Sequence, residues 1–170
     1  DVYQAAATPV FSFLSTAPKA AALVLLMRLL SVLPVDFQKL LAIIALVSIL
    51  AGNLAALWQN DLKRLLAYSG IAQAGFIIVG LVAFNQTGFE SAAFYMTVYV
   101  IINIAVFLLI DLVGQNSPTL ASIAGKGETM PFLCVCFTLL MVALVGLPPT
   151  AGFTAKLLVF SALWEAYQAT

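Results

Sequence analysis

Four long apolar segments limit what this chain can fold into. They run over residues 9–33, 40–58, 62–84 and 91–113, and each is close to the roughly 20 residues that an α-helix needs to cross a bilayer. The chain is 64% hydrophobic and only 8% charged, whereas a soluble domain carries about 25% charged residues. So few charges cannot cover a surface in water. The sequence therefore predicts an all-α, polytopic transmembrane helix bundle.

A fifth apolar segment, residues 130–164, is too long for one straight helix. It contains Gly146 and Leu147 followed by Pro148 and Pro149, and prolines lack the amide proton that a continuing helix needs. The favoured interpretation is a discontinuous helix whose halves, 130–145 and 151–164, meet at membrane depth. The alternative is two crossings joined by a tight turn, each only about 15 residues long and short for a full span. The first segment also contains a proline, Pro18, which predicts an interruption there.

Basic residues near the segment ends suggest an orientation. Alternate loops of a bundle lie on the same side, so Lys63, Arg64 and Lys126 share one side, and Lys39 with Arg28 share the other. The positive-inside rule places the Lys63 and Lys126 loops in the cytoplasm, by a margin of one charge. Lys63 and Arg64 are interpreted as a cytoplasmic anchor, or alternatively as an entrance for protons.

Composition also excludes several kinds of chemistry. The chain has no net charge and no histidine, so it lacks the basic stripe expected of a nucleic-acid partner and the commonest metal ligand. Cys134 and Cys136 have no histidine or further cysteine near them and are expected to be packing residues, so no metal site is predicted. Residues 1–8 do not resemble a signal peptide. Because the chain begins and ends beside hydrophobic segments, we expect it to be part of a longer protein.

Lys19 lies near the middle of the first apolar segment. A lysine at the centre of a bilayer costs about 2.5–3.5 kcal/mol or more, and such residues usually mark an ion or proton path. One interpretation is a protonatable relay, favoured by the preceding Pro18, which frees a backbone carbonyl and lets a polar partner approach. The other is a static lysine that pairs with a carboxylate or carbonyl and holds helices together.

Lys156 follows the predicted break by about two turns. Interrupted helices expose backbone groups and helix-end dipoles, which form ion sites in transporters. Lys156 is therefore a second candidate relay. The alternative is a lysine at a helix end that extends to the lipid headgroups.

Polar residues line one face of the fourth apolar segment. Tyr95, Tyr99 and Asn103 are spaced by four, so they form a stripe on a helix. The stripe fits a hydrated path or hydrogen bonds between helices equally well. Three further residues on neighbouring helices could extend such a path: Asn53, Ser69 and Gln73.

Three motifs resemble one known family. They are Asp-Val-Tyr-Gln at 1–4, Asn-Asp-Leu-Lys-Arg-Leu-Leu-Ala-Tyr-Ser at 60–69, and Gly-Leu-Pro-Pro-Thr-Ala-Gly-Phe-Thr-Ala-Lys at 146–156. Together, in this order and spacing, they resemble subunit N of bacterial NADH-quinone oxidoreductase, respiratory complex I. The resemblance covers essentially the whole chain.

The resemblance implies an antiporter-like fold with inverted five-helix repeats, each containing one discontinuous helix. Residues 1–170 would form part of a single proton-translocation domain, from the eighth to the twelfth of fourteen helices. Lys19 falls at the lysine of the eighth helix, in the middle of the proton route, and Lys156 at that of the twelfth, near the periplasmic exit. Sister subunits carry histidines and a lysine where this chain has its neutral stripe, so no histidine relay is carried over.

The leading hypothesis is a proton-translocating membrane subunit of NADH-quinone oxidoreductase in the bacterial inner membrane, driven by electron transfer elsewhere. No cofactor is expected on this chain, since the resemblance places NADH, flavin, iron–sulfur clusters and quinone elsewhere in the complex. Other membrane subunits and lipid are the expected partners. One alternative is a subunit of a cation/proton antiporter or membrane-bound hydrogenase, which share the fold. Another is a purely structural membrane bundle.

Overall fold

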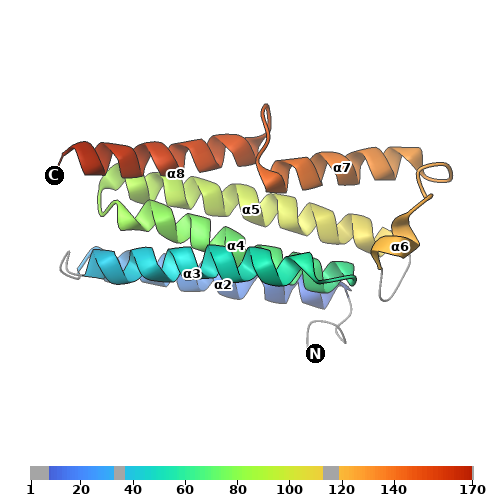
Figure 1. The fold of residues 1–170 in the computed structure, drawn as a ribbon, viewed down its shortest axis with the longest axis horizontal. Helices are drawn as coiled ribbons and strands as arrows, with labels where there is room; N and C mark the ends of the chain where they lie inside the picture. Colours follow the sequence, from blue (N-terminus) through green and yellow to red (C-terminus); the bar gives the residue numbers. More distant parts are fainter. Residues whose placement is uncertain (1–7, 33–36, 113–118, 170) are drawn as a thin grey trace.

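The protein is a bundle of long antiparallel helices (Figure 1). A computed structural model describes residues 8–32, 37–112 and 119–169. Within these residues, four helices contain spans long and apolar enough to cross a membrane, which confirms the all-α transmembrane prediction. They are α2 (Thr8–Leu30), α3 (Gln38–Leu57), α4 (Leu62–Val82) and α5 (Gln86–Leu112).

Helices α4 and α5 form the middle of the bundle. In Figure 1, α2 and α3 lie along one side of this pair, and α7 (Pro131–Val145) and α8 (Ala151–Gln168) lie along the other. Helix α5 packs against α2, α4, α7 and α8. Its side chains Val106, Phe107 and Ile110 are almost completely buried. Polar residues on α4 and α5 are therefore held between the two outer layers.

Helix α3 is attached almost entirely through α4. The two backbones approach closely at Gly52, where an added Cβ would lie 2.6 Å from the amide nitrogen of Ala72. At the far end, Gln38 donates from Nε2 to the carbonyl oxygen of Val82 (2.8 Å). The opposite face of α3 is apolar and exposed, as expected of a surface covered by lipid or by further protein. Together the two helices make a closely packed hairpin.

The proline-rich segment breaks a helix rather than turning the chain back. Helices α7 and α8 follow each other end to end in one direction along the bundle (Figure 1), so the interpretation of two short crossings is wrong. Pro131 begins α7, where its missing amide proton costs nothing, and Gly146 ends it in the left-handed conformation (φ 81°), which favours glycine. The ends of the two helices overlap, because a Cβ on Gly152 would lie 1.8 Å from the carbonyl oxygen of Ala143.

The predicted interruption at Pro18 is wrong. Helix α2 continues through Pro18 without a break. A proline fits helical φ and removes only its own backbone hydrogen bond, and transmembrane helices tolerate this where neighbouring groups support the backbone. Just before it, the hydroxyl groups of Ser15 and Thr16 donate to the carbonyl oxygen of Ser12 (3.0 and 2.7 Å).

Two predicted loops contain helical structure. Helix α5 begins at Gln86 rather than at residue 91, because the Asn85 side chain accepts a hydrogen bond from the amide of Gly88 (2.7 Å) and so caps its first turn. The stretch between the fourth and fifth apolar segments, residues 114–129, includes the short helix α6 (Leu120–Ile123), which begins with a capping box made by Thr119 and Ser122. Residues 114–118 of that stretch lie outside the described residues.

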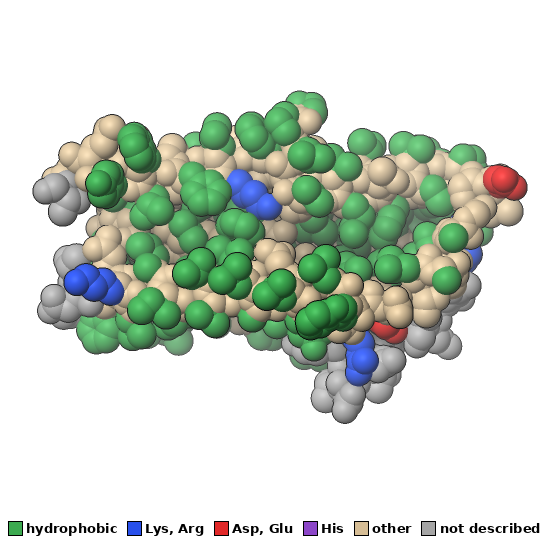
Figure 2. Space-filling view, viewed as in Figure 1, with side chains coloured by type: hydrophobic (Ala, Val, Ile, Leu, Met, Phe, Trp, Pro, Cys, Tyr) green, Lys and Arg blue, Asp and Glu red, His purple; other side chains and the backbone are tan. Residues whose placement is uncertain are grey.

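The two ends of the bundle carry the basic residues as the alternating topology predicts. The amide of Leu120 donates to the carbonyl oxygen of Asn60 (3.1 Å), so the segments that lead to Lys63 and Lys126 lie at one end. Lys39, near the start of α3, lies at the other (Figure 1). On the face shown in Figure 2, hydrophobic side chains cover most of the length, and one Lys or Arg side chain lies at mid-length.

Candidate functional site

Lys19 turns into the bundle. It is half-buried, and its ammonium group lies beside Gly70 of α4, where an added Cβ would be 2.6 Å from Lys19 Nζ. The same hypothetical Cβ would be 2.7 Å from the hydroxyl oxygen of Tyr99. The tips of Lys19 and Tyr99 therefore occupy the space that a side chain at position 70 would fill. This arrangement brings together two of the residues that the sequence identified.

Asn103 connects the polar stripe of α5 to α2. Its side chain is 2% exposed, and Nδ2 donates to Ser15 Oγ (3.0 Å). Ser15 in turn donates to the carbonyl oxygen of Ser12. Bonds of this kind hold membrane helices together because lipid offers no competing partner. Asn103 thus makes the interhelical bond that was one of the two interpretations of the stripe.

Tyr95 connects the stripe to the helix break through Gln73 of α4. The Tyr95 hydroxyl donates to Gln73 Oε1, and Gln73 Nε2 donates to the carbonyl oxygen of Leu144, in the last turn of α7 (2.9 Å). Both side chains are buried. A single carboxamide therefore joins α4, α5 and α7.

Lys156 binds the end of α7. Its Nζ donates to the carbonyl oxygen of Val145 (2.8 Å) and lies 4.6 Å from the centroid of the Phe76 ring, within the range of a cation–π contact. Carbonyls at a helix C-terminus lack backbone partners and carry partial negative charge, so they attract an ammonium group. The interpretation of Lys156 as a lysine that extends to the headgroups does not describe this geometry.

A cavity lies beside Lys156. It has a volume of about 650 Å³, enough for several water molecules. Its walls include side chains from α3, α4 and α8, and it extends from Gln59, near the α3–α4 turn, to the helix break. The polar residues that border it are Asn53, Gln59, Ser69, Gln73 and Lys156. The three residues that the sequence suggested as extensions of the path all lie there.

Helix α4 relates these contacts to one another. Gly70, Gln73 and Phe76 follow at intervals of three and are neighbours on its surface. Gly70 lies against Lys19, Gln73 bonds to Tyr95, and Phe76 lies under Lys156. The three positions span about 9 Å along the helix axis. The two lysines are thus held against one short stretch of α4.

Lys63 and Arg64 differ in their surroundings. Asp61 accepts a hydrogen bond from the amide of Arg64 (3.0 Å) and caps the start of α4. Arg64 is exposed, but Lys63 is only 2% exposed. The two residues lie in the first turn of α4, about two turns before Gly70.

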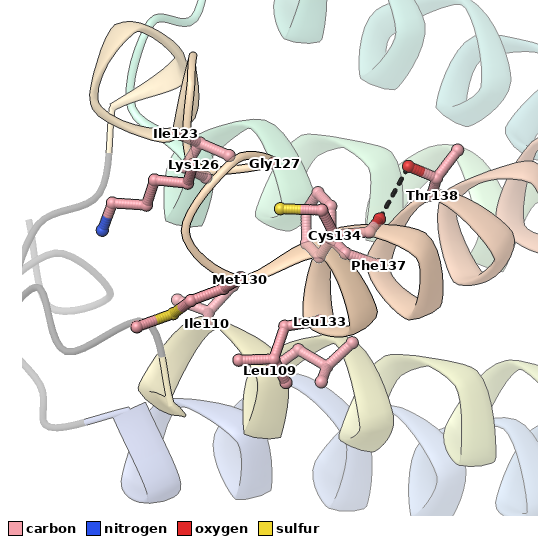
Figure 3. Close-up of a pocket in the computed structure, with 10 residues that line it drawn as sticks. All are labelled: Leu109, Ile110, Ile123, Lys126, Gly127, Met130, Leu133, Cys134, Phe137 and Thr138. Atoms are coloured by element: carbon pink, nitrogen blue, oxygen red, sulfur yellow. Dashed lines mark hydrogen bonds between the residues drawn. The ribbon is translucent and has the colours of Figure 1, made fainter.

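A second cavity, of about 260 Å³, lies between α5, α7 and the loop that contains Lys126 (Figure 3). Its walls are largely apolar, and the Lys126 ammonium group points away from Cys134 and Phe137. This cavity shares no lining residue with the polar contacts described above. Cys134 and Cys136 are free thiols. Within the described residues, no three His, Cys, Asp or Glu side chains are grouped to hold a metal ion.

The long apolar helices, the discontinuous helix and the lysines held inside the bundle define a multi-pass membrane protein with a transporter-like interior. The model of the family described as NADH:quinone oxidoreductase/Mrp antiporter, TM, matches residues 1–170, and the chain belongs to this family.

Individual relatives support the same assignment. NADH-quinone oxidoreductase subunit N of Chlorobium chlorochromatii is 41% identical over 96% of this chain and 34% of its own length. The chloroplastic NAD(P)H-quinone oxidoreductase subunit 2 of Chlorokybus atmophyticus is 39% identical over 98% of this chain and 34% of its own.

A solved structure of respiratory complex I from Thermus thermophilus superimposes with a TM-score of 0.84 and 36% identity, over 97% of this chain and 37% of that one. The chain spans about a third of the length of these relatives. The resemblance to subunit N that the three motifs indicated is confirmed.

Proposed function

We propose that this chain is part of the proton route through the membrane arm of an NADH-quinone oxidoreductase. The observation that carries the proposal is the placement of Lys19 and Lys156 against one stretch of α4, each turned toward polar groups inside the bundle. A lysine enclosed by helices changes its charge in response to neighbouring charges. Such a pair can accept and release protons in turn as the charge around it shifts.

Each described contact has a role in this route. Lys19 receives a proton with the Tyr99 hydroxyl beside it, at the position where the two tips meet Gly70. Lys156 exchanges protons with water in the adjoining cavity, which is polar along the side formed by Asn53, Ser69 and Gln73. Between these two regions Tyr95 and Gln73 order the polar groups. The chain performs no redox chemistry in this scheme.

We extend the proposal to the rest of the complex. NADH, flavin, iron–sulfur clusters and quinone bind on other parts of the complex, and electron transfer there supplies the energy as a shift in charge. Other membrane subunits and lipid contact the apolar faces of the bundle. In this proposal the membrane is the bacterial inner membrane, since bacterial proteins are among the relatives, and the Lys63 end lies in the cytoplasm.

The test measures protons moved per electron in the intact complex, reconstituted in vesicles and containing the full-length subunit. Lys19→Ala should nearly abolish translocation through this subunit while the complex still assembles. Lys39→Ala is the matched control, because Lys39 is exposed at the start of α3. This variant should pump as the wild type does. Wild-type translocation by Lys19→Ala would refute the proposed function. A thermal-shift comparison separates the proposed function from the alternative of a purely structural bundle. That alternative predicts that Lys19→Ala loses stability instead of translocation.

A second candidate function is cation/proton antiport, which the family description includes. It predicts that vesicles containing the protein exchange protons for sodium or potassium without any electron donor. The assay is a sodium gradient imposed on the vesicles, with an internal pH dye as the readout. Proton movement that requires NADH and a quinone supports the first function, and movement driven by the sodium gradient alone supports the second.

A further inference from the structure

Gln73 uses both ends of its carboxamide to join separate helices. Its side chain is 7% exposed. The oxygen accepts from the Tyr95 hydroxyl on α5, and the nitrogen donates to the Leu144 carbonyl on α7 (2.9 Å). A carboxamide has one accepting and one donating end. If the group rotated by half a turn, its oxygen would face the Leu144 carbonyl, and two acceptors would oppose each other. The Leu144 carbonyl therefore fixes the orientation of Gln73.

The carbonyl that Gln73 holds belongs to the helix break. The last four carbonyls of a helix have no partner within it. In α7, Leu144 and Val145 belong to this group, and their oxygens accept from Gln73 and Lys156 respectively. One of these two side chains comes from α4 and the other from α8. If Lys156 releases Val145, the bond from Gln73 still holds the end of α7.

Gln73 itself is a poor carrier of protons. A carboxamide does not titrate near neutral pH, and passing a proton through it requires an unstable charged or imidic acid form. It borders the cavity that also contains Lys156, so water there offers protons a route around it. Its two bonds therefore position groups and do not conduct.

We infer that Gln73 is a positioning residue that ties the end of α7 to Tyr95, so that the helix break keeps its place while Lys156 exchanges its proton. The inference rests on the proposed function for its consequence in pumping. Its structural part, that Gln73 restrains the end of α7, depends only on the two hydrogen bonds. Gln73 is thus a further residue of the route, one that acts through its neighbours.

The experiment compares Gln73→Met with Gln38→Met in the full-length subunit within the assembled complex. Methionine keeps the length of the side chain and removes both bonds. Gln38 is the matched control, because it also donates to a carbonyl of another helix (2.8 Å, Val82) but lies at the far end of the α3–α4 hairpin. Gln73→Met should lower proton translocation through this subunit by about 2- to 30-fold, the factor that corresponds to the roughly 0.5–2 kcal/mol by which such residues change the coupling between two sites. Gln38→Met should not change it.

Gln73→Glu supplies a readout that a merely structural role would not move. The ionised carboxylate can accept from Tyr95 but opposes the Leu144 carbonyl, whereas the protonated acid can donate to it. Pumping by Gln73→Glu should therefore recover as the pH falls, relative to the wild type. A wild-type pH profile in this variant would overturn the inference. So would failure of both Gln73 variants to assemble while Gln38→Met assembles.

A second measurement separates this inference from the proposed function. Leu147→Cys places a thiol in the exposed part of the break, and its rate of reaction with a maleimide reports how well the end of α7 is held. Gln73→Met should raise that rate, and Gln38→Met should leave it unchanged. If Lys19→Ala pumps normally, the proposed function fails whatever Gln73 does. If Lys19→Ala is inactive but Gln73→Met matches the wild type in both assays, the positioning role alone fails.

Discussion

Lys19 and Tyr99 share one space, although they come from different helices. A Cβ at position 70 would lie 2.6 Å from the ammonium nitrogen of Lys19 and 2.7 Å from the hydroxyl oxygen of Tyr99. The atoms that would collide with it are both at the ends of side chains. The absence of a side chain at Gly70 thus determines how far Lys19 reaches into the bundle.

Gly70→Ala should therefore impair proton movement more than it impairs folding. The added methyl displaces two flexible tips, so the stability cost should be at the low end of the roughly 1–3 kcal/mol typical of overpacking. Translocation per electron in reconstituted vesicles is the measurement. Gly52→Ala is the contrasting control, since its methyl meets the backbone nitrogen of Ala72 at 2.6 Å and should lower stability instead. Normal pumping by Gly70→Ala would count against a role for the Lys19–Tyr99 arrangement.

Lys156→Arg separates a relay from a static pair. Arginine can still donate to the Val145 carbonyl and lie over Phe76, but it stays protonated under all working conditions. We expect thermal stability close to that of the wild type with translocation lost. Lys156→Met should lose translocation and also part of the stability, because the Val145 carbonyl then loses its hydrogen bond from α8. If Lys156→Arg pumps normally, Lys156 holds the helix break without exchanging protons.

Asn103→Leu should loosen the contact between α2 and α5. The substitution removes the buried bond to Ser15 (3.0 Å), and such bonds in membrane proteins contribute about 0.6–2 kcal/mol. Thermal or chemical denaturation of the purified protein in detergent measures the loss of stability. Thr97→Val is the control, because Thr97 donates only to Ala93 of its own helix and its loss should cost less. Equal stability of the two variants would contradict the role of the Asn103–Ser15 bond in holding α2 against α5.

Gly152→Ala should prevent α7 and α8 from meeting as they do. Its methyl would lie 1.8 Å from the Ala143 carbonyl oxygen, which is backbone and cannot move aside without shifting the helix end. The expected cost is at or above the upper end of about 1–3 kcal/mol for overpacking, seen as less assembled complex in membranes. Gly127→Ala, where nothing lies within 4 Å, should assemble normally. Normal assembly of Gly152→Ala would show that the overlap at the break is dispensable.

The sequence predicted the helices well because membrane crossings depend on length and apolarity, which are local properties. It also predicted the discontinuous helix, since two adjacent prolines after Gly146 cannot continue a helix. It did not predict the effect of Pro18. Whether a proline breaks a transmembrane helix depends on support from neighbouring groups, and a single lost hydrogen bond at Pro18 leaves α2 continuous.

The candidate site was only partly predictable. Lys19, Lys156 and the stripe stand out because polar residues are rare in apolar segments. Their partners depend on packing between helices that are distant in sequence. Gln73 appeared in the sequence as one of three possible extensions of a path, and only the fold shows that it joins Tyr95 to Leu144. Gly70 has no polar side chain, so nothing in the sequence was a reason to include it in the site. The burial of Lys63 depends on contacts that its neighbours in sequence do not reveal.

The attachment of α3 through α4 bears on how the protein enters its membrane. The two helices are neighbours along the chain and pack closely at Gly52, and the bond from Gln38 joins them at the far end. Such a unit can insert as a preformed pair before α5, α7 and α8 are synthesised. Helix α5 would then pack against a partner that is already in place.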